Sequence, residues 1–97
     1  MNDRILLRGI QFFAHHGAYD EERRQGQRFL VDLDLTPQVE AAAVGDDLSR
    51  TVDYGKAHAI VMEIGTQHQF RLLETLGVRI ANTLLERLPV RQVTVRV

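Results

Sequence analysis

The 97-residue sequence predicts a small α+β domain in which an antiparallel sheet carries two main helices on one face. Two observations predict this class. Three segments are typical of strands, and in two of them, 27–36 and 91–97, apolar residues alternate with polar ones. Between these two segments, apolar residues recur at helical spacing in two further segments. The length allows one domain, 1–97, and excludes two. A domain of this size has a modest core, which assembly into oligomers often completes.

The first half of the chain predicts two strands joined by a long polar segment. Residues 4–14 are typical of a strand, with Gly9 as a candidate bulge, and residues 27–36 alternate cleanly. We expect residues 15–26 to form a loop with a function, because idle hairpin loops are usually shorter. The apolar face of the second strand comprises Phe29, Val31, Leu33 and Leu35.

Two helices are expected in the second half. Asp53 is placed to cap a helix over residues 54–65, and a second helix runs from about Leu72 to Leu88, where Pro89 stops it. The first apolar face comprises Ala57, Ile60, Val61 and Ile64; the second comprises Leu73, Leu76, Ile80, Leu84 and Leu88.

The remaining segments are a short turn and a last strand. Pro37 is expected to open a turn of helix that Gly45 closes, and residues 46–53 form a connector. Residues 91–97 alternate again, with Val93, Val95 and Val97 on one face. This strand ends the chain without a following partner, so an open sheet edge is expected where topology alone would add a fourth strand.

Composition excludes several classes of function. The net charge of -1 gives no broad basic face, which argues against a nucleic acid or an acidic membrane as partner. The absence of cysteine excludes disulfides and thiolate chemistry. The N-terminus has no signal-peptide pattern and no segment is apolar enough to span a membrane, so we expect a cytoplasmic protein. No glycine pattern for a phosphate site is present.

The histidines favour packing or surface roles over a metal site. His15 and His16 are adjacent at a strand end, where neighbouring side chains point to opposite sides. His58 and His68 stand at no familiar spacing for metal ligands. We therefore expect no metal.

Three other residues have both an ordinary and a functional interpretation. Glu22 lies in a run of charged residues, and its ordinary interpretation is that this run is simply exposed to solvent. Glu74 lies near a helix start, where it offsets the helix dipole, but a carboxylate could also accept two adjacent N–H donors of a ligand. Tyr54 is either an amphipathic surface residue or a phenol for proton transfer. From these residues alone the ordinary interpretations are favoured, and the sequence indicates only an α+β domain with a functional loop.

Four segments taken together are more specific. HHGAYDEE at 15–22, GQRF at 26–29, TVDY at 51–54 and LLETL at 72–76 resemble the dihydroneopterin aldolase family in order and spacing along the whole chain. The resemblance implies the tunnelling fold, in which subunits join their sheets into a ring. It also implies a homo-oligomer, a tetramer or an octamer of two stacked rings, with pterin sites between neighbouring subunits.

The resemblance also implies roles for particular residues. Glu74 corresponds to the carboxylate that anchors the amino-pyrimidinone edge of the pterin. Glu22 corresponds to the loop glutamate that contacts the substrate and organises proton transfer, and Tyr54 to the tyrosine that hydrogen-bonds the reacting side chain or its water. Backbone groups complete the recognition: Leu73 and, from the adjacent subunit, Val52 and Asp53.

The implied reaction is a retro-aldol cleavage of 7,8-dihydroneopterin in folate biosynthesis, without metal or cofactor. The family continues with a further strand and a lysine that serves in acid–base catalysis, which would lie beyond Val97, so we expect the domain to be C-terminally incomplete. The only lysine, Lys56, is expected at the surface. Arg71 stands where the family often has a small polar residue.

Alternative functions remain open at this stage. A dihydroneopterin triphosphate epimerase shares the fold, and its substrate would call for a basic cluster at the pocket mouth. A non-catalytic pterin-binding or assembly module would keep Glu74 without a lysine, and a structural domain would bind no ligand at all.

Overall fold

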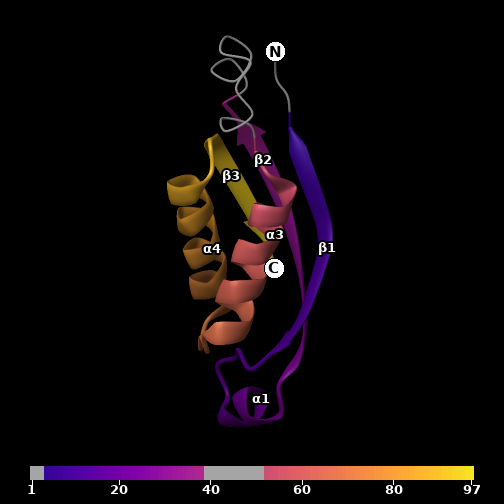
Figure 1. Cartoon of the computed structure of the whole chain (residues 1–97). Helices are drawn as coiled ribbons and strands as arrows, with labels where there is room; N and C mark the ends of the chain where they lie inside the picture. Colours follow the sequence, from indigo (N-terminus) through magenta and orange to yellow (C-terminus); the bar gives the residue numbers. More distant parts are fainter. Residues whose placement is uncertain (1–3, 39–51) are drawn as a thin grey trace.

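The computed structural model describes residues 4–38 and 52–97, shown in Figure 1. The predicted turn closed by Gly45, and the connector up to residue 51, lie outside the described residues. In chain order the elements are β1 (Ile5–Ala14), α1 (Asp20–Gln25), β2 (Gln27–Pro37), α3 (Tyr54–Gln67), α4 (Leu73–Arg87) and β3 (Val90–Arg96).

The three strands form one antiparallel sheet in the order β1-β2-β3. β1 pairs with β2 along its whole length, whereas β3 pairs only with the second half of β2, from Asp32 to Pro37. The far halves of β1 and β2 therefore extend past β3 as a long hairpin with α1 at its tip (Figure 1). The predicted antiparallel α+β class is confirmed, with β3 at an edge of the described sheet.

The bulge expected at Gly9 is confirmed. The pairing register of β1 with β2 shifts between Leu7 and Ile10, and the Gly9 amide donates a hydrogen bond to Oδ1 of Asp32 at 2.8 Å. The carboxylate thus satisfies an amide that the bulge takes out of the ladder. Beyond the bulge, Ile10, Phe12 and Ala14 face the core.

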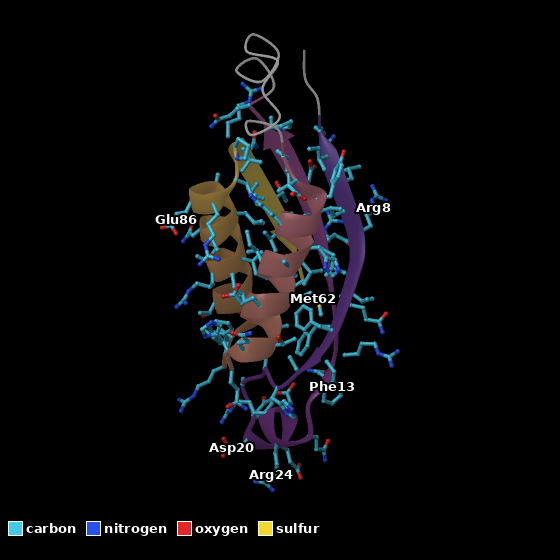
Figure 2. The ribbon with its side chains drawn as sticks, viewed as in Figure 1. Arg8, Phe13, Asp20, Arg24, Met62 and Glu86 are labelled. Carbon is cyan, nitrogen blue, oxygen red and sulfur yellow. The ribbon has the colours of Figure 1, made fainter. Side chains whose placement is uncertain are left out.

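Both long helices cover the same face of the sheet, with α3 packed on β1 and α4 on β3 (Figure 1). Their buried positions match the predicted periodicity; they are Ala57, Ile60, Val61 and Ile64 on α3 and Leu76, Ile80 and Leu84 on α4. Figure 2 shows Met62 between α3 and β1, while Arg8 projects from β1 away from the helices. None of the described helices is long and apolar enough to cross a membrane.

We predicted a loop over residues 15–26, but α1 occupies Asp20–Gln25 within this segment. This helix has acidic residues in its first turn and arginines in its last, which is favourable to the helix dipole. It buries no residue, so it leaves no apolar periodicity in the sequence from which it could be predicted.

Smaller differences concern element ends. Pro37 does not open a helix but ends β2, a position where a missing amide is tolerated. α3 continues to Gln67, past the predicted end at residue 65. Leu73 and Val97, assigned to buried faces, are each 40% exposed. Periodicity identifies a face but cannot tell whether other parts of the chain cover its ends.

Candidate functional site

The predicted site residues fall into two groups, which lie at opposite ends of the folded molecule. Glu22 on α1 and the Leu73–Glu74 pair at the start of α4 lie at the end of the molecule that carries the hairpin tip (Figure 1). The 52–54 segment lies at the other end, where α3 begins (Figure 1). α3 runs between the two ends, and its 14 residues span about 21 Å. Within one chain, Tyr54 therefore cannot meet Glu74.

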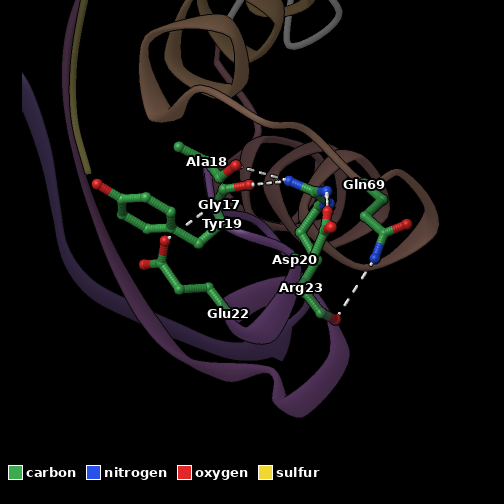
Figure 3. Close-up of polar contacts among 7 residues, drawn as sticks. All are labelled: Gly17, Ala18, Tyr19, Asp20, Glu22, Arg23 and Gln69. Atoms are coloured by element: carbon green, nitrogen blue, oxygen red, sulfur yellow. Dashed lines mark hydrogen bonds and ion pairs between the residues drawn. The ribbon is translucent and has the colours of Figure 1, made fainter.

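The loop before Glu22 is folded by the Arg23 side chain. Its guanidinium donates hydrogen bonds to the carbonyl oxygens of Gly17 at 2.8 Å and Ala18 at 3.0 Å, and it pairs with Asp20 (Figure 3). Two of these acceptors are backbone groups, so the arginine fixes the course of the main chain rather than a side-chain position. The segment is therefore held in one shape although it buries little apolar surface.

Glu22 packs against the same loop. Its Oε1 accepts a hydrogen bond from the Tyr19 amide at 3.2 Å. A side chain at Gly17 would bring its Cβ to 2.8 Å from Cβ of Glu22, so the close approach requires glycine there. Figure 3 shows the Glu22 carboxylate and the Tyr19 ring on the side of the loop away from Arg23. The carboxylate is exposed and can still accept hydrogen bonds from a ligand.

The connector 68–72 joins this loop to α4. The Gly17 amide donates to the Phe70 carbonyl oxygen at 2.9 Å, and the Phe70 amide donates to Nδ1 of His16 at 3.0 Å. The side-chain Nε2 of Gln69 donates a longer hydrogen bond of 3.5 Å to the Arg23 carbonyl oxygen (Figure 3). The loop that carries Glu22 and the helix start that carries Glu74 are thus attached to the same short connector.

Glu74 borders an open groove of about 450 Å³ between the first turns of α4 and the end of β3. The groove is lined by Leu73, Glu74, Gly77, Val78, Ala81, Val95 and Val97. Every lining residue except Glu74 is apolar, and Val78 is 59% exposed. An apolar surface with one carboxylate at its edge suits a flat ring system that carries N–H donors.

The groove explains why Leu73 and Val97 are not buried. Leu73 and Glu74 were predicted as site residues from the sequence, whereas the rest of the lining, notably Val78 and Val97, was not. The usable signal was Val78, an apolar residue of α4 that lies outside the predicted core face.

At the other end of the molecule, the start of α3 is held by a helix cap. Oδ1 of Asp53 accepts hydrogen bonds from the amides of Gly55 at 2.8 Å and Lys56 at 3.2 Å, which confirms the predicted cap. Val52 is buried, whereas Tyr54 is 58% exposed. The Asp53 side chain is therefore engaged in its own helix. Lys56 is exposed, as predicted.

The adjacent histidines differ as expected from their spacing: His15 is exposed and His16 is fully buried. Burial lowers the pKa of His16 below its ordinary value, because the charged form loses its hydration. Among the described residues no three His, Asp or Glu side chains gather as a metal site would require. The sequence predicted a packing or surface role for His16, but not its hydrogen bond to the connector.

Comparisons with known proteins agree on one family. Residues 5–97 match the family model described as dihydroneopterin aldolase. A dihydroneopterin aldolase of Bacillus subtilis is 38% identical over 96 residues, which cover 98% of this chain and 80% of the relative. One of Streptomyces coelicolor is 41% identical over 93 residues, covering 96% of this chain and 78% of the relative.

Solved structures give the same picture of the fold. The Escherichia coli dihydroneopterin aldolase in complex with neopterin superposes with a TM-score of 0.84 at 22% identity, over 97% of this chain and 82% of that one. A dihydroneopterin aldolase from a Burkholderia species, bound to guanine, gives a TM-score of 0.77 at 29% identity over 97% and 74%. The structural agreement is consistent with the tunnelling fold.

Proposed function

This chain belongs to the dihydroneopterin aldolase family, and from that premise we propose that it cleaves 7,8-dihydroneopterin into 6-hydroxymethyl-7,8-dihydropterin and glycolaldehyde. It is an aldolase, a carbon–carbon lyase of folate biosynthesis. The observation that carries the proposed substrate is the groove at Glu74, which is apolar apart from this one carboxylate. We place the enzyme in the cytoplasm.

Glu74 acts as the anchor of the pterin. The amino-pyrimidinone edge presents adjacent N–H donors, and the two oxygens of a carboxylate can accept both of them. The apolar groove beside Glu74 would cover a face of the ring, and the Leu73 backbone, at the first residue of α4, would extend the recognition. In water-excluded surroundings a ligand without these donors would leave the carboxylate unpaired, at a cost that makes the site selective.

Glu22 and Tyr54 serve the proton transfers. A base removes the proton of the side-chain hydroxyl as the carbon–carbon bond breaks, and the electrons of that bond move into the C=N bond of the pterin ring. A proton then returns to the carbon that stays on the ring. Glu22 has an exposed carboxylate, one oxygen of which accepts from the Tyr19 amide, and Tyr54 has an exposed phenol; both are suitable groups for such steps. The acid–base lysine that the resemblance implies beyond Val97 stays a prediction.

The active site is shared by two copies in a homo-oligomer, a tetramer or an octamer. The distance of about 21 Å along α3 supports this, because one chain cannot bring Tyr54 to Glu74. A neighbouring copy would supply Tyr54 together with the backbone of Val52 and Asp53. Exposed apolar residues on the groove would be covered where the copies meet.

The epimerase alternative has no specific support. The relatives described above are named as aldolases, and the groove at Glu74 is lined by no basic residue that would receive a triphosphate. Turnover of dihydroneopterin triphosphate without cleavage of dihydroneopterin would overturn the aldolase assignment.

The direct test is a fluorescence assay of 7,8-dihydroneopterin cleavage and of neopterin binding. Glu74→Gln keeps the shape of the side chain but removes its charge and one acceptor, so we expect the Kd for neopterin to rise about ten- to a hundredfold. Glu86→Gln is the matched control, since Glu86 is an exposed glutamate near the other end of the same helix (Figure 2). Equal binding by the two variants would refute the anchoring role.

A further inference from the structure

His16 is a fully buried histidine whose two ring nitrogens both contact main-chain groups of distant segments. Nε2 lies 2.7 Å from the carbonyl oxygen of Gly65, near the end of α3, and Nδ1 lies 3.0 Å from the amide nitrogen of Phe70. A carbonyl oxygen can only accept and an amide N–H can only donate. The hydrogen is therefore on Nε2, and Nδ1 is the acceptor, which defines a neutral ring in one tautomer.

The surroundings hold the ring in this place. It stacks on Phe70 with centroids 5.4 Å apart and meets Phe29 edge-on at 5.2 Å. Gly65 is required at its position, because a Cβ there would lie 2.4 Å from the Phe12 ring. The missing side chain lets Phe12 pack directly on α3 beside the carbonyl group that His16 contacts.

Phe70 is held on both of its main-chain groups. His16 accepts from its amide, and the Gly17 amide donates to its carbonyl oxygen at 2.9 Å. Gly17 is also the residue against which Glu22 packs. α4 begins three residues after Phe70, with Leu73 and Glu74. The His16–Phe70 hydrogen bond is thus one of the contacts, beside Gly17–Phe70 and Gln69–Arg23, that link the two carboxylates used by the proposed function.

We propose that His16 is a positioning residue of the pterin site: its neutral ring holds Phe70 and so sets Glu22 relative to Glu74, and its protonation releases Phe70. The inference rests on the proposed function, because it concerns the geometry of that same site. His16 itself does not contact the groove, since it is buried and absent from the groove lining.

The release follows from the hydrogen-bond roles. A second proton on Nδ1 would point at the Phe70 amide, so two donors would face each other and the bond would be lost. Burial is the main reason why the pKa of His16 lies below 6.5; the Gly65 hydrogen bond opposes this, and His15 and His68 add to it. The charged and titratable groups on the segments that meet at this junction include His15, Glu22 and Arg23 at the hairpin tip, His68 and Arg71 on the connector, and Glu74 and Arg79 on α4, with the Arg79 guanidinium 5.8 Å from the centre of the Phe70 ring. The link is accordingly intact at neutral pH and opens only in acid.

Two variants separate the two ring nitrogens. In His16→Asn the side-chain oxygen can take the place of Nδ1 and keep the Phe70 amide bonded, whereas in His16→Gln the side-chain NH₂ can replace only the Nε2–H donor to Gly65. We expect His16→Asn to keep kcat/KM for dihydroneopterin within about threefold of wild type, and His16→Gln to lower it about ten- to a hundredfold, since small misplacements of catalytic groups are costly.

The dependence of kcat/KM on pH separates the proposed role from simple packing, because a side chain that only fills space would not change it. Wild type should lose kcat/KM below pH 6.5 with one proton, and His16→Asn should lack that step. His58→Gln is the control, because His58 is an exposed histidine on α3, and it should keep the wild-type profile. If both His16 variants match wild type in kcat/KM and in the acid limb, His16 only fills space and the inference is wrong.

A measurement on the wild-type protein covers the case in which the variants do not fold. Ring ¹⁵N NMR should report an Nε2–H tautomer at neutral pH, and the protonation of His16 should occur at the same pH as the loss of neopterin affinity. Protonation at a clearly different pH would overturn the proposal. Wild type that neither binds nor cleaves pterin would refute the proposed function and this inference together, whereas active wild type with indifferent His16 variants would refute this inference alone.

Discussion

The two ends of this molecule are built in different ways. At the hairpin tip, polar contacts tie the 15–26 segment to the connector 68–72, through His16, Gly17 and Gln69. At the start of α3, one side chain, that of Asp53, caps the helix beside an exposed Tyr54. The tip end is organised within the chain, and the α3 end presents a fixed helix start to its surroundings.

Under the proposed function, the difference would let a small chain contribute to a site that it does not assemble alone. At the tip, hydrogen bonds hold the Glu22 loop and the connector that leads to Glu74, and at the other end the Asp53 cap holds the helix start that carries Tyr54. If a second copy joins the two ends as proposed, neither end would need to refold. Perturbations at each end should therefore have separate and predictable effects.

The largest expected effect on stability comes from Gly65→Ala. The added Cβ would meet the Phe12 ring at 2.4 Å, so we expect a loss of about 1–3 kcal/mol in the free energy of unfolding from overpacking. This corresponds to a fall in Tm of roughly 4 °C or more for a domain of this size. Gly77→Ala on α4 is the control, because its Cβ would make only an ordinary 3.8 Å contact with Val97. Equal Tm values for the two variants would show that the Phe12 contact is not tight.

The next effect concerns the α3 end. Asp53→Ala removes the acceptor for the Gly55 and Lys56 amides, and the loss of such a cap costs about 1 kcal/mol. Chemical denaturation should show this loss, and Asp53→Ser should recover most of it. If Asp53→Ala unfolds at the same denaturant concentration as wild type, the cap does not support the start of α3.

The pH dependence of stability should report on the tip end. The pKa of His16 is lowered in the folded state, so below pH 6.5 the unfolded chain binds more protons at this residue than the folded chain does. His16 therefore does not lower the free energy of unfolding above pH 6.5. It lowers this free energy progressively as the pH falls from 6.5 towards the pKa that His16 has in the folded protein. Denaturation midpoints of wild type should show this decline, and those of His16→Asn should show a smaller one.

The smallest effect is expected on the face of the sheet that the helices do not cover. Arg4 pairs with Asp34 on the exposed face of the sheet, where it lowers the pKa of the Asp34 carboxyl through a hydrogen bond. Because the Arg4 side chain is largely exposed to solvent and that of Asp34 is partly exposed, Arg4→Ala should leave Tm and pterin affinity unchanged within error at physiological salt. A clear loss of affinity would mean that the sheet face contributes to the site.

Local sequence patterns predicted most of the fold. Alternation located β2 and β3, an apolar run with few polar residues located β1, and helical spacing located α3 and α4. Asp53 was recognisable as a cap because its partners are two and three residues away. α1 was missed, since a helix that buries no residue leaves no periodic signal.

The candidate site was predicted by resemblance more than by pattern. Glu22, Tyr54 and Glu74 each had a sufficient ordinary explanation on chemistry alone. His16 could not be assigned a role from its neighbours in the sequence, because its hydrogen-bond partners, Gly65 and Phe70, are 49 and 54 residues away. Such contacts are set by the packing of the whole chain.

The central claim, that one site takes groups from the opposite ends of two copies, can be tested by mixing two inactive variants. Tyr54→Phe should lower kcat by a factor of about 10²–10⁴ if the phenol takes part in proton transfer, and Glu74→Gln should lose pterin affinity. If Tyr54 and Glu74 come from different copies, refolding the two variants together at equal amounts should restore about a quarter of wild-type activity, because about that fraction of interfaces pairs two intact halves. No recovery above the separate variants, in oligomers shown to contain both chains, would contradict the account.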